Sequence, residues 1–255
     1  MAPLAFEFFF RLLWGWNFYL IFISREESSE AFLKVSARFS FGFALTALLA
    51  GYSAGMSSME QLPLFLTFLS SLAYLSRRFL PLRLFSVGII LFTPLLLLPS
   101  RGLLFSANMM LSSLALGGAF MGQFLGHWYL NVPNIHIREF KRISNFSFAS
   151  LIARCLWVLA VVLFFKVASE GMISGEFFSL RGDYWNGLGA FGTLLFTSRV
   201  LWGLIAPLLL SWMAKKTVDM RSTQSATGIF YANSVLMLLG ELCALYLEKE
   251  LKWPI

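Results

Sequence analysis

The chain has 255 residues, of which 58% are hydrophobic and 13% are charged, whereas about 25% of the residues in soluble domains are charged. The mean hydropathy is +0.74. A soluble fold could not hide this much apolar surface, so the composition excludes a soluble enzyme or binding domain. The formal charge of +7 comes from short Lys and Arg clusters between apolar segments, a pattern that indicates membrane topology rather than nucleic-acid binding.

Apolar segments recur along the whole chain between charged or Pro-, Gly- and Ser-rich breaks. About 20 apolar residues cross the ~30 Å hydrocarbon layer as a helix, so each segment is a candidate membrane span. In chain order, the predicted spans lie near residues 8–24, 38–54, 62–76, 84–99, 104–130, 145–168, 185–212 and 225–247. The sequence therefore predicts an all-α integral membrane protein, a polytopic bundle of about eight transmembrane helices in one domain over residues 1–255.

The first segment allows two arrangements. Its Trp14, Trp16 and Tyr19 suit a membrane-spanning helix, but they also suit an amphipathic helix that lies at the membrane surface. No basic region precedes this segment, which argues against a cleaved signal peptide.

Basic residues alternate between the predicted loops. Loops after odd-numbered spans contain Arg25, Lys34, Arg77, Arg78, Arg83, Arg138, Lys141, Arg142, Lys215, Lys216 and Arg221. Loops after even-numbered spans and the tail contain Arg101, Arg181, Lys249 and Lys252. By the positive-inside rule, both termini are expected to be extracytoplasmic, and the expected location is a bacterial inner membrane.

The last predicted span has a polar stripe along one helical face. Its members are Gln224, Thr227, Tyr231, Ser234 and Glu241. At about 100° per residue they fall within one sector of the helix. Such a stripe either makes interhelical hydrogen bonds or lines a ligand cavity, and both readings stay open.

The fifth predicted span combines small and polar residues. Gly118, Gly122 and Gly126 are spaced four apart, which lets a neighbouring helix approach closely and also leaves space for a flat cofactor. Gln123 and His127 lie on the adjoining face towards the cytoplasmic end. His127 is interpreted as an interfacial hydrogen-bonding residue or as a ligand to a quinone carbonyl or a haem iron.

Charged residues inside predicted spans are costly, so they are expected to face a partner or a cavity. Arg154 in the sixth span could reach the headgroups or join the cavity of Gln123, His127 and Gln224. Arg199 and Glu241 lie at similar depths in the last two spans. We therefore expect them to form an intramembrane ion pair.

Three functions fit these residues. The first is a subunit of an electron-transfer complex that binds a quinone, with or without one b-type haem, through the residues Gln123, His127, Arg154, Gln224, Thr227 and Tyr231. The second is a transporter or lipid-handling protein whose anion site is formed by Arg154, Arg199 and the start of the last predicted span. The third is a scaffold subunit without chemistry. The expected partners are membrane lipids and other membrane protein subunits, and no nucleic acid is expected.

Overall fold

A computed structural model describes most of the chain. The described ranges are residues 2–23, 30–75, 102–132, 137–169 and 189–251, with Ile255 and a few positions between 87 and 96. They fold into helices, with no strand within these ranges. The elements are α1 (Ala2–Ile21), α2 (Glu30–Ser53), α3 (Ser58–Leu75), α6 (Leu103–Asn131), α7 (Arg138–Ser169), α9 (Gly189–Val200), the π-helical turn η1 (Leu201–Ile205), α10 (Ala206–Asp219) and α11 (Thr223–Leu251).

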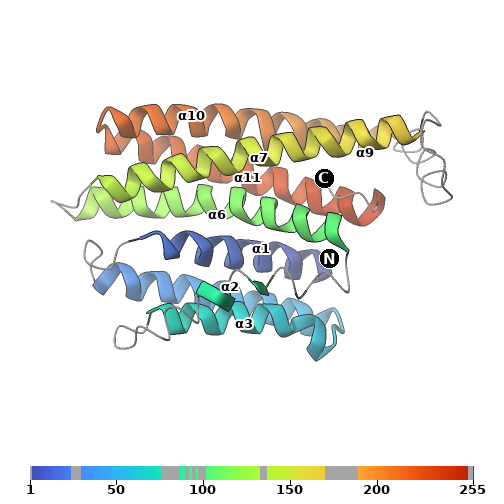
Figure 1. Ribbon diagram of the computed structural model, residues 1–255, viewed down its shortest axis with the longest axis horizontal. Helices are drawn as coiled ribbons and strands as arrows, with labels where there is room; N and C mark the ends of the chain where they lie inside the picture. Colours follow the sequence, from blue (N-terminus) through green and yellow to red (C-terminus); the bar gives the residue numbers. More distant parts are fainter. Residues whose placement is uncertain are drawn as a thin grey trace.

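The helices run side by side along one axis, and both chain termini lie at the same end of the bundle (Figure 1). Five helical segments of the described residues are long and apolar enough to cross a membrane. They are Ala31–Ser53, Leu103–Asn131, Arg138–Phe164, Ala190–Asp219 and Thr223–Glu250. The prediction of an all-helical membrane protein is thereby confirmed, whereas the count of eight spans and the orientation stay predictions. Most of the fourth predicted span, 84–99, lies outside the described residues.

Helix α1 lies at the centre of the bundle, where it packs mainly against α6 and α2. Its aromatic side chains Trp14, Trp16 and Tyr19 are buried against neighbouring helices. These side chains therefore do not form the exposed apolar face that an amphipathic surface helix would need.

Several helices are longer than the apolar segments that predicted them. Helix α7 begins at Arg138 rather than near residue 145, and α10 ends at Asp219 rather than near residue 212. The first turn of α7 is stabilised by an ion pair between Glu139 and Arg142, whose charged atoms are 3.5 Å apart. An apolar window reports the thickness of the hydrocarbon layer, whereas polar residues continue the helix into the headgroup region.

Glycines set the closest helix contacts. Gly15 of α1 and Gly117 of α6 touch through their backbones, and a Cβ at either position would overlap the other helix. The predicted stripe serves packing as well: Gly118 faces Tyr19 of α1, while Gly122 and Gly126 face side chains of α11. No space for a flat cofactor lies over these three glycines, because neighbouring side chains fill it.

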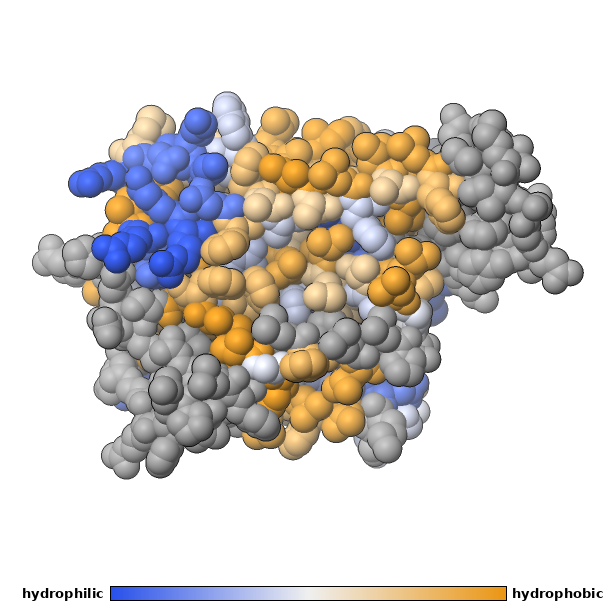
Figure 2. Space-filling model, in the orientation of Figure 1, coloured by the Kyte–Doolittle hydropathy of each residue, from blue (hydrophilic) through white to orange (hydrophobic). Residues whose placement is uncertain are grey.

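The surface is divided into an apolar band and a hydrophilic end (Figure 2). The band includes large exposed side chains such as Leu156, Leu159, Leu194 and Leu209. The hydrophilic patch lies over the start of α7 and the end of α10, where the sequence carries Lys141, Arg142, Lys215 and Lys216. This distribution suits a bundle whose sides face lipid and whose basic end faces water.

Candidate functional sites at the two ends of the bundle

The first candidate site is an aromatic cavity in the basic half of the bundle. It lies between α1, α2, α6 and α11 and has a volume of about 490 Å³. Its lining consists of Trp16, Val35, Phe39, Phe43, Phe120, Gln123, Phe124, His127, Trp128, Asn131 and Tyr231. Ligand cavities for small organic molecules commonly measure about 300–1,000 Å³ and are lined by apolar side chains with a few polar groups.

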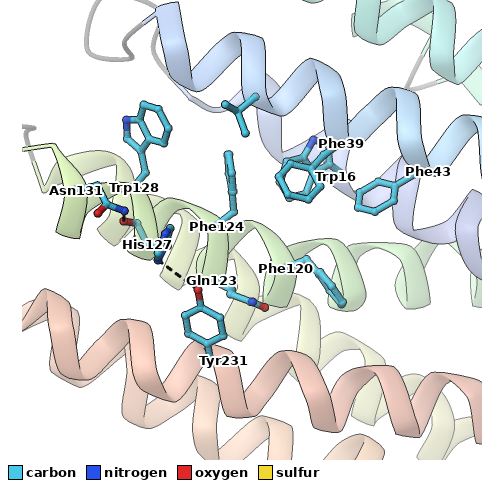
Figure 3. Close-up of a pocket in the computed structure, with 11 residues that line it drawn as sticks. Trp16, Phe39, Phe43, Phe120, Gln123, Phe124, His127, Trp128, Asn131 and Tyr231 are labelled. Atoms are coloured by element: carbon cyan, nitrogen blue, oxygen red, sulfur yellow. Dashed lines mark hydrogen bonds between the residues drawn. The ribbon is translucent and has the colours of Figure 1, made fainter.

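The polar groups of this cavity gather on one side (Figure 3). Gln123, His127 and Asn131 follow one another at four-residue intervals on α6, so they share a helical face. Tyr231 reaches across from α11, and its hydroxyl shares a hydrogen bond of 3.3 Å with Nδ1 of His127. The Tyr231 side chain is 43% exposed, so the polar side of the cavity is open rather than enclosed.

This hydrogen bond bears on which imidazole nitrogen carries the proton. When the Tyr231 hydroxyl donates to Nδ1 of His127, the neutral ring holds its proton on Nε2. The Asn131 amide donates to the backbone carbonyl of His127 at 3.0 Å and so does not occupy the ring nitrogen Nε2. His127 can then donate from Nε2 to a ligand oxygen.

Aromatic rings form the opposite wall. Phe124 of α6 lies between rings of two other helices, with its centroid 5.2 Å from that of Trp16 and 5.3 Å from that of Phe39. Centroid distances of this size give favourable aromatic contacts. The wall therefore offers a flat ligand a preformed apolar surface.

Three of the residues expected at this site lie elsewhere. Gln224 is exposed near the start of α11 and is not part of the lining. Thr227 is buried against Gly126, and its hydroxyl donates to the carbonyl of Thr223 at 2.7 Å. Arg154 belongs to the opposite half of the bundle. The expectation of one cavity shared by Gln123, His127, Arg154 and Gln224 is thus corrected: the structure brings only the first two together.

The second candidate site is a buried ionic network in the other half of the bundle. Arg11 of α1 donates through Nη1 to Oε1 of Glu241 at 2.7 Å and through Nη2 to Oε2 of Glu248 at 2.6 Å. Ser112 of α6 also donates to Glu241, and the Asn108 amide donates to Glu248 at 3.3 Å. These contacts join α1, α6 and α11 through two carboxylates.

Two further arginines complete the network. Arg199 of α9 and Arg154 of α7 place Nη2 at 3.8 and 3.9 Å from Oε2 of Glu241. The expected pair of Arg199 and Glu241 therefore lies within ion-pair distance, as one contact of a larger cluster. Arg154 also donates through Nη1 to the side chain of Asn108, which accepts a second hydrogen bond of 3.1 Å from Trp157.

Arg11 and Asn108 also belong to this network, although the sequence did not predict them as members. Arg11 was visible as a charged residue inside the first apolar segment, and such a residue normally faces a partner inside the bundle. Asn108 had a weaker signal, because an uncharged amide in an apolar helix is equally at home in an interhelical hydrogen bond.

Comparison of the chain with known protein families, with curated proteins and with solved structures found no match. The two sites therefore rest on their own geometry. Within the described residues, no group of three or more His, Cys, Asp or Glu side chains could hold a metal ion.

Proposed function

We propose that the chain is an integral membrane subunit of an electron-transfer complex and binds a quinone in the aromatic cavity. The observation that carries this proposal is the hydrogen-bonded pair of His127 and Tyr231 beside an apolar aromatic wall. A quinone ring needs a flat apolar surface and a hydrogen-bond donor for its carbonyl oxygens.

The donors have distinct tasks in this proposal. His127 donates from Nε2 to one quinone carbonyl, and the side-chain amide of Gln123, on the same helical face, is placed to donate to a carbonyl oxygen of the quinone as well. Trp16 and Phe124 contact the ring face. The open side of the cavity lets the ligand arrive from the membrane, and the nearby basic end gives it access to protons from water.

The lining fits a quinone better than a haem. It contains one imidazole, His127, and no methionine or cysteine, and the hydroxyl of its Tyr231 is hydrogen-bonded to that same imidazole rather than placed opposite it as a second axial ligand. The other histidine of the chain, His136, lies outside the described residues. We therefore assign His127 to a quinone carbonyl rather than to a haem iron.

Quinone binding can be measured by tryptophan fluorescence, because Trp16 and Trp128 line the cavity and a bound quinone quenches nearby indoles. Purified protein in neutral detergent is titrated with ubiquinone-1 and, separately, with menadione. Saturable quenching is expected with at least one of them. Replacing His127→Ala or Tyr231→Phe should weaken binding about tenfold, the loss expected when one hydrogen bond to the ligand is removed or misdirected.

A matched control is Tyr52→Phe, which removes a hydroxyl from an exposed tyrosine of α2 outside the cavity. This variant should bind like the unaltered protein. Quenching that does not saturate, or that is equal in His127→Ala, Tyr231→Phe and Tyr52→Phe, would show that the cavity holds no quinone.

A further inference from the structure

The inner end of the ionic network has more cationic than anionic groups. Arg154 and Arg199 are fully buried, and Glu241 is the one carboxylate within ion-pair distance of both among the described residues. Oε1 of Glu241 accepts hydrogen bonds from Arg11 and Ser112, while its Oε2, which faces the two inner arginines, accepts none among the described residues. Glu241 is thus within ion-pair distance of three guanidinium groups, of which only Arg11 has further carboxylates beside it in the part of the chain that the structure describes.

The other carboxylates of this region belong to the Arg11 end. Glu248 accepts a hydrogen bond from Nη2 of Arg11 at 2.6 Å, and Glu7 interacts electrostatically with the same guanidinium. Their charges compensate Arg11 directly. The positive charge of Arg154 and Arg199 is compensated far less closely, and buried charge without a close counterion is costly.

Both inner arginines also leave the same edge of the guanidinium unused. Arg154 donates through Nη1 to Asn108, and Arg199 donates through Nη1 to the carbonyl of Gly203 at 3.3 Å. The Nε and Nη2 atoms of both are buried without a hydrogen-bond partner among the described residues. The nearest carboxylate oxygen, Oε2 of Glu241, is too distant at 3.8 and 3.9 Å for a hydrogen bond.

The edge formed by Nε and Nη2 is the one through which arginine binds carboxylate and phosphate groups with two hydrogen bonds. Its two parallel N–H groups match two oxygens of an oxyanion, which gives arginine its preference for such partners. Arg199 is further held by the π-helical turn η1, which begins two residues later and whose Gly203 touches the backbone of Gly240. Single π-helical turns within longer helices frequently occur at functional sites.

We propose that Arg154 and Arg199 bind an oxyanion, a phosphate or carboxylate group, through their Nε and Nη2 atoms beside Glu241. The oxyanion supplies the acceptors that four buried N–H positions lack and the negative charge that Glu241 alone does not provide. The group comes either from a free anion or from the headgroup of an anionic lipid. This site is separate from the aromatic cavity and does not depend on quinone binding.

The test uses the full chain purified in neutral detergent. Its unfolding temperature is measured with increasing sodium phosphate against sodium chloride at equal ionic strength, and in phosphatidylcholine bilayers with and without phosphatidylglycerol. A ligand that binds only the folded state raises this temperature in a saturable manner. A rise with phosphate assigns the site to a free oxyanion, and a rise with phosphatidylglycerol alone assigns it to a lipid headgroup.

Variants of the two arginines test whether the anion-dependent rise in unfolding temperature comes from this site. Arg199→Lys and Arg154→Lys keep the charge but lose the paired N–H groups, so each should weaken the apparent affinity about tenfold or more. Arg142→Lys makes the same change on the exposed surface of the opposite end and should leave the affinity unchanged. Native mass spectrometry of the unaltered protein provides a count of retained phosphate or lipid that needs no folded variant.

Two results would overturn the proposal. One is a wild-type protein with no anion-dependent rise in unfolding temperature and no retained phosphate or lipid, which would leave water as the partner of these N–H groups. The other is an affinity that stays unchanged in both Arg199→Lys and Arg154→Lys.

Discussion

At the scale of single residues, Glu241 is the central acceptor of the ionic network, but its three arginines are not equivalent. Arg11 is in direct hydrogen-bond contact at 2.7 Å, whereas Arg199 approaches only to 3.8 Å. Double-mutant cycles with Gln substitutions should show a coupling of about 1.5–3 kcal/mol for Arg11 with Glu241. The coupling of Arg199 with Glu241 should stay below about 1.5 kcal/mol, because no hydrogen bond joins them.

The measurement is the free energy of unfolding in mixed detergent micelles. Glu241→Gln alone should cost about 3–5 kcal/mol, since it leaves buried guanidinium groups without their shared counterion. The pair of Lys141 and Asp219 is a surface control with charged atoms 3.4 Å apart, and its coupling should be about 1 kcal/mol or less. A stronger coupling to Arg199 than to Arg11 would contradict the geometry described above.

The sequence predicts part of this network and misses the rest for a physical reason. The depths of Arg199 and Glu241 follow from their distances to the ends of two consecutive spans, so their proximity could be expected. Arg11 lies in a helix that is far away in sequence, and its place beside α11 depends on the tertiary packing of α1. No periodicity within one segment contains that information.

At the scale of elements, the crossing of α1 and α6 depends on two glycines. A Cβ on Gly117 would overlap the backbone of Gly15, so Gly117→Ala should push the helices apart. Overpacking of this kind typically costs about 1–3 kcal/mol. The expected result is a clear fall in the unfolding temperature of the purified protein.

Gly228→Ala is the matched control for this substitution. Gly228 lies within α11, and a Cβ there meets no atom within 4 Å. Alanine is about 0.5–1 kcal/mol more favourable than glycine in a helix, so this variant should unfold at the same or a higher temperature. If both substitutions lowered the unfolding temperature equally, the loss at Gly117 could not be attributed to its close contact with Gly15.

The elements themselves were largely predictable. Apolar windows located the helices around residues 104–130 and 225–247, because hydrocarbon thickness imposes the same length on every span. The π-helical turn η1 was not predictable, since the change in backbone hydrogen bonding occurs where Gly203 crosses Gly240. The sequence also favoured Gly118 over Gly117, although the closest backbone contact is made at Gly117.

At the scale of the whole molecule, the two candidate sites lie in opposite halves of the bundle. His127 and Tyr231 are near the ends of α6 and α11 that meet the basic surface, whereas Glu241 and Glu248 are near the end that holds the chain termini. Arg154 was predicted to share the His127 cavity because the two residues lie at similar depths relative to the predicted loops. Depth alone does not say which helices are neighbours, and only the packed bundle separates the two sites.

The orientation of the bundle decides which membrane side each site serves. The basic end carries Lys141, Arg142, Lys215 and Lys216, and the positive-inside rule predicts that this end faces the cytoplasm. The aromatic cavity would then open in the cytoplasmic half, and the ionic network would lie in the outer half. Both termini would be extracytoplasmic, at the end where Figure 1 shows them together.

Labelling of single cysteines can test this orientation in bacterial cells that express the chain. The native Cys155 and Cys243 are first replaced by alanine. Ser222→Cys then lies in the turn between α10 and α11 at the basic end, and Ser53→Cys lies at the end of α2 on the opposite side. Both positions are exposed, so a membrane-impermeant maleimide can reach each one from the side that it faces.

Ser53→Cys should react in intact cells, and Ser222→Cys should react only after the inner membrane is opened. The reverse pattern would place the aromatic cavity in the outer half, where a bound quinone would exchange protons with the extracytoplasmic side.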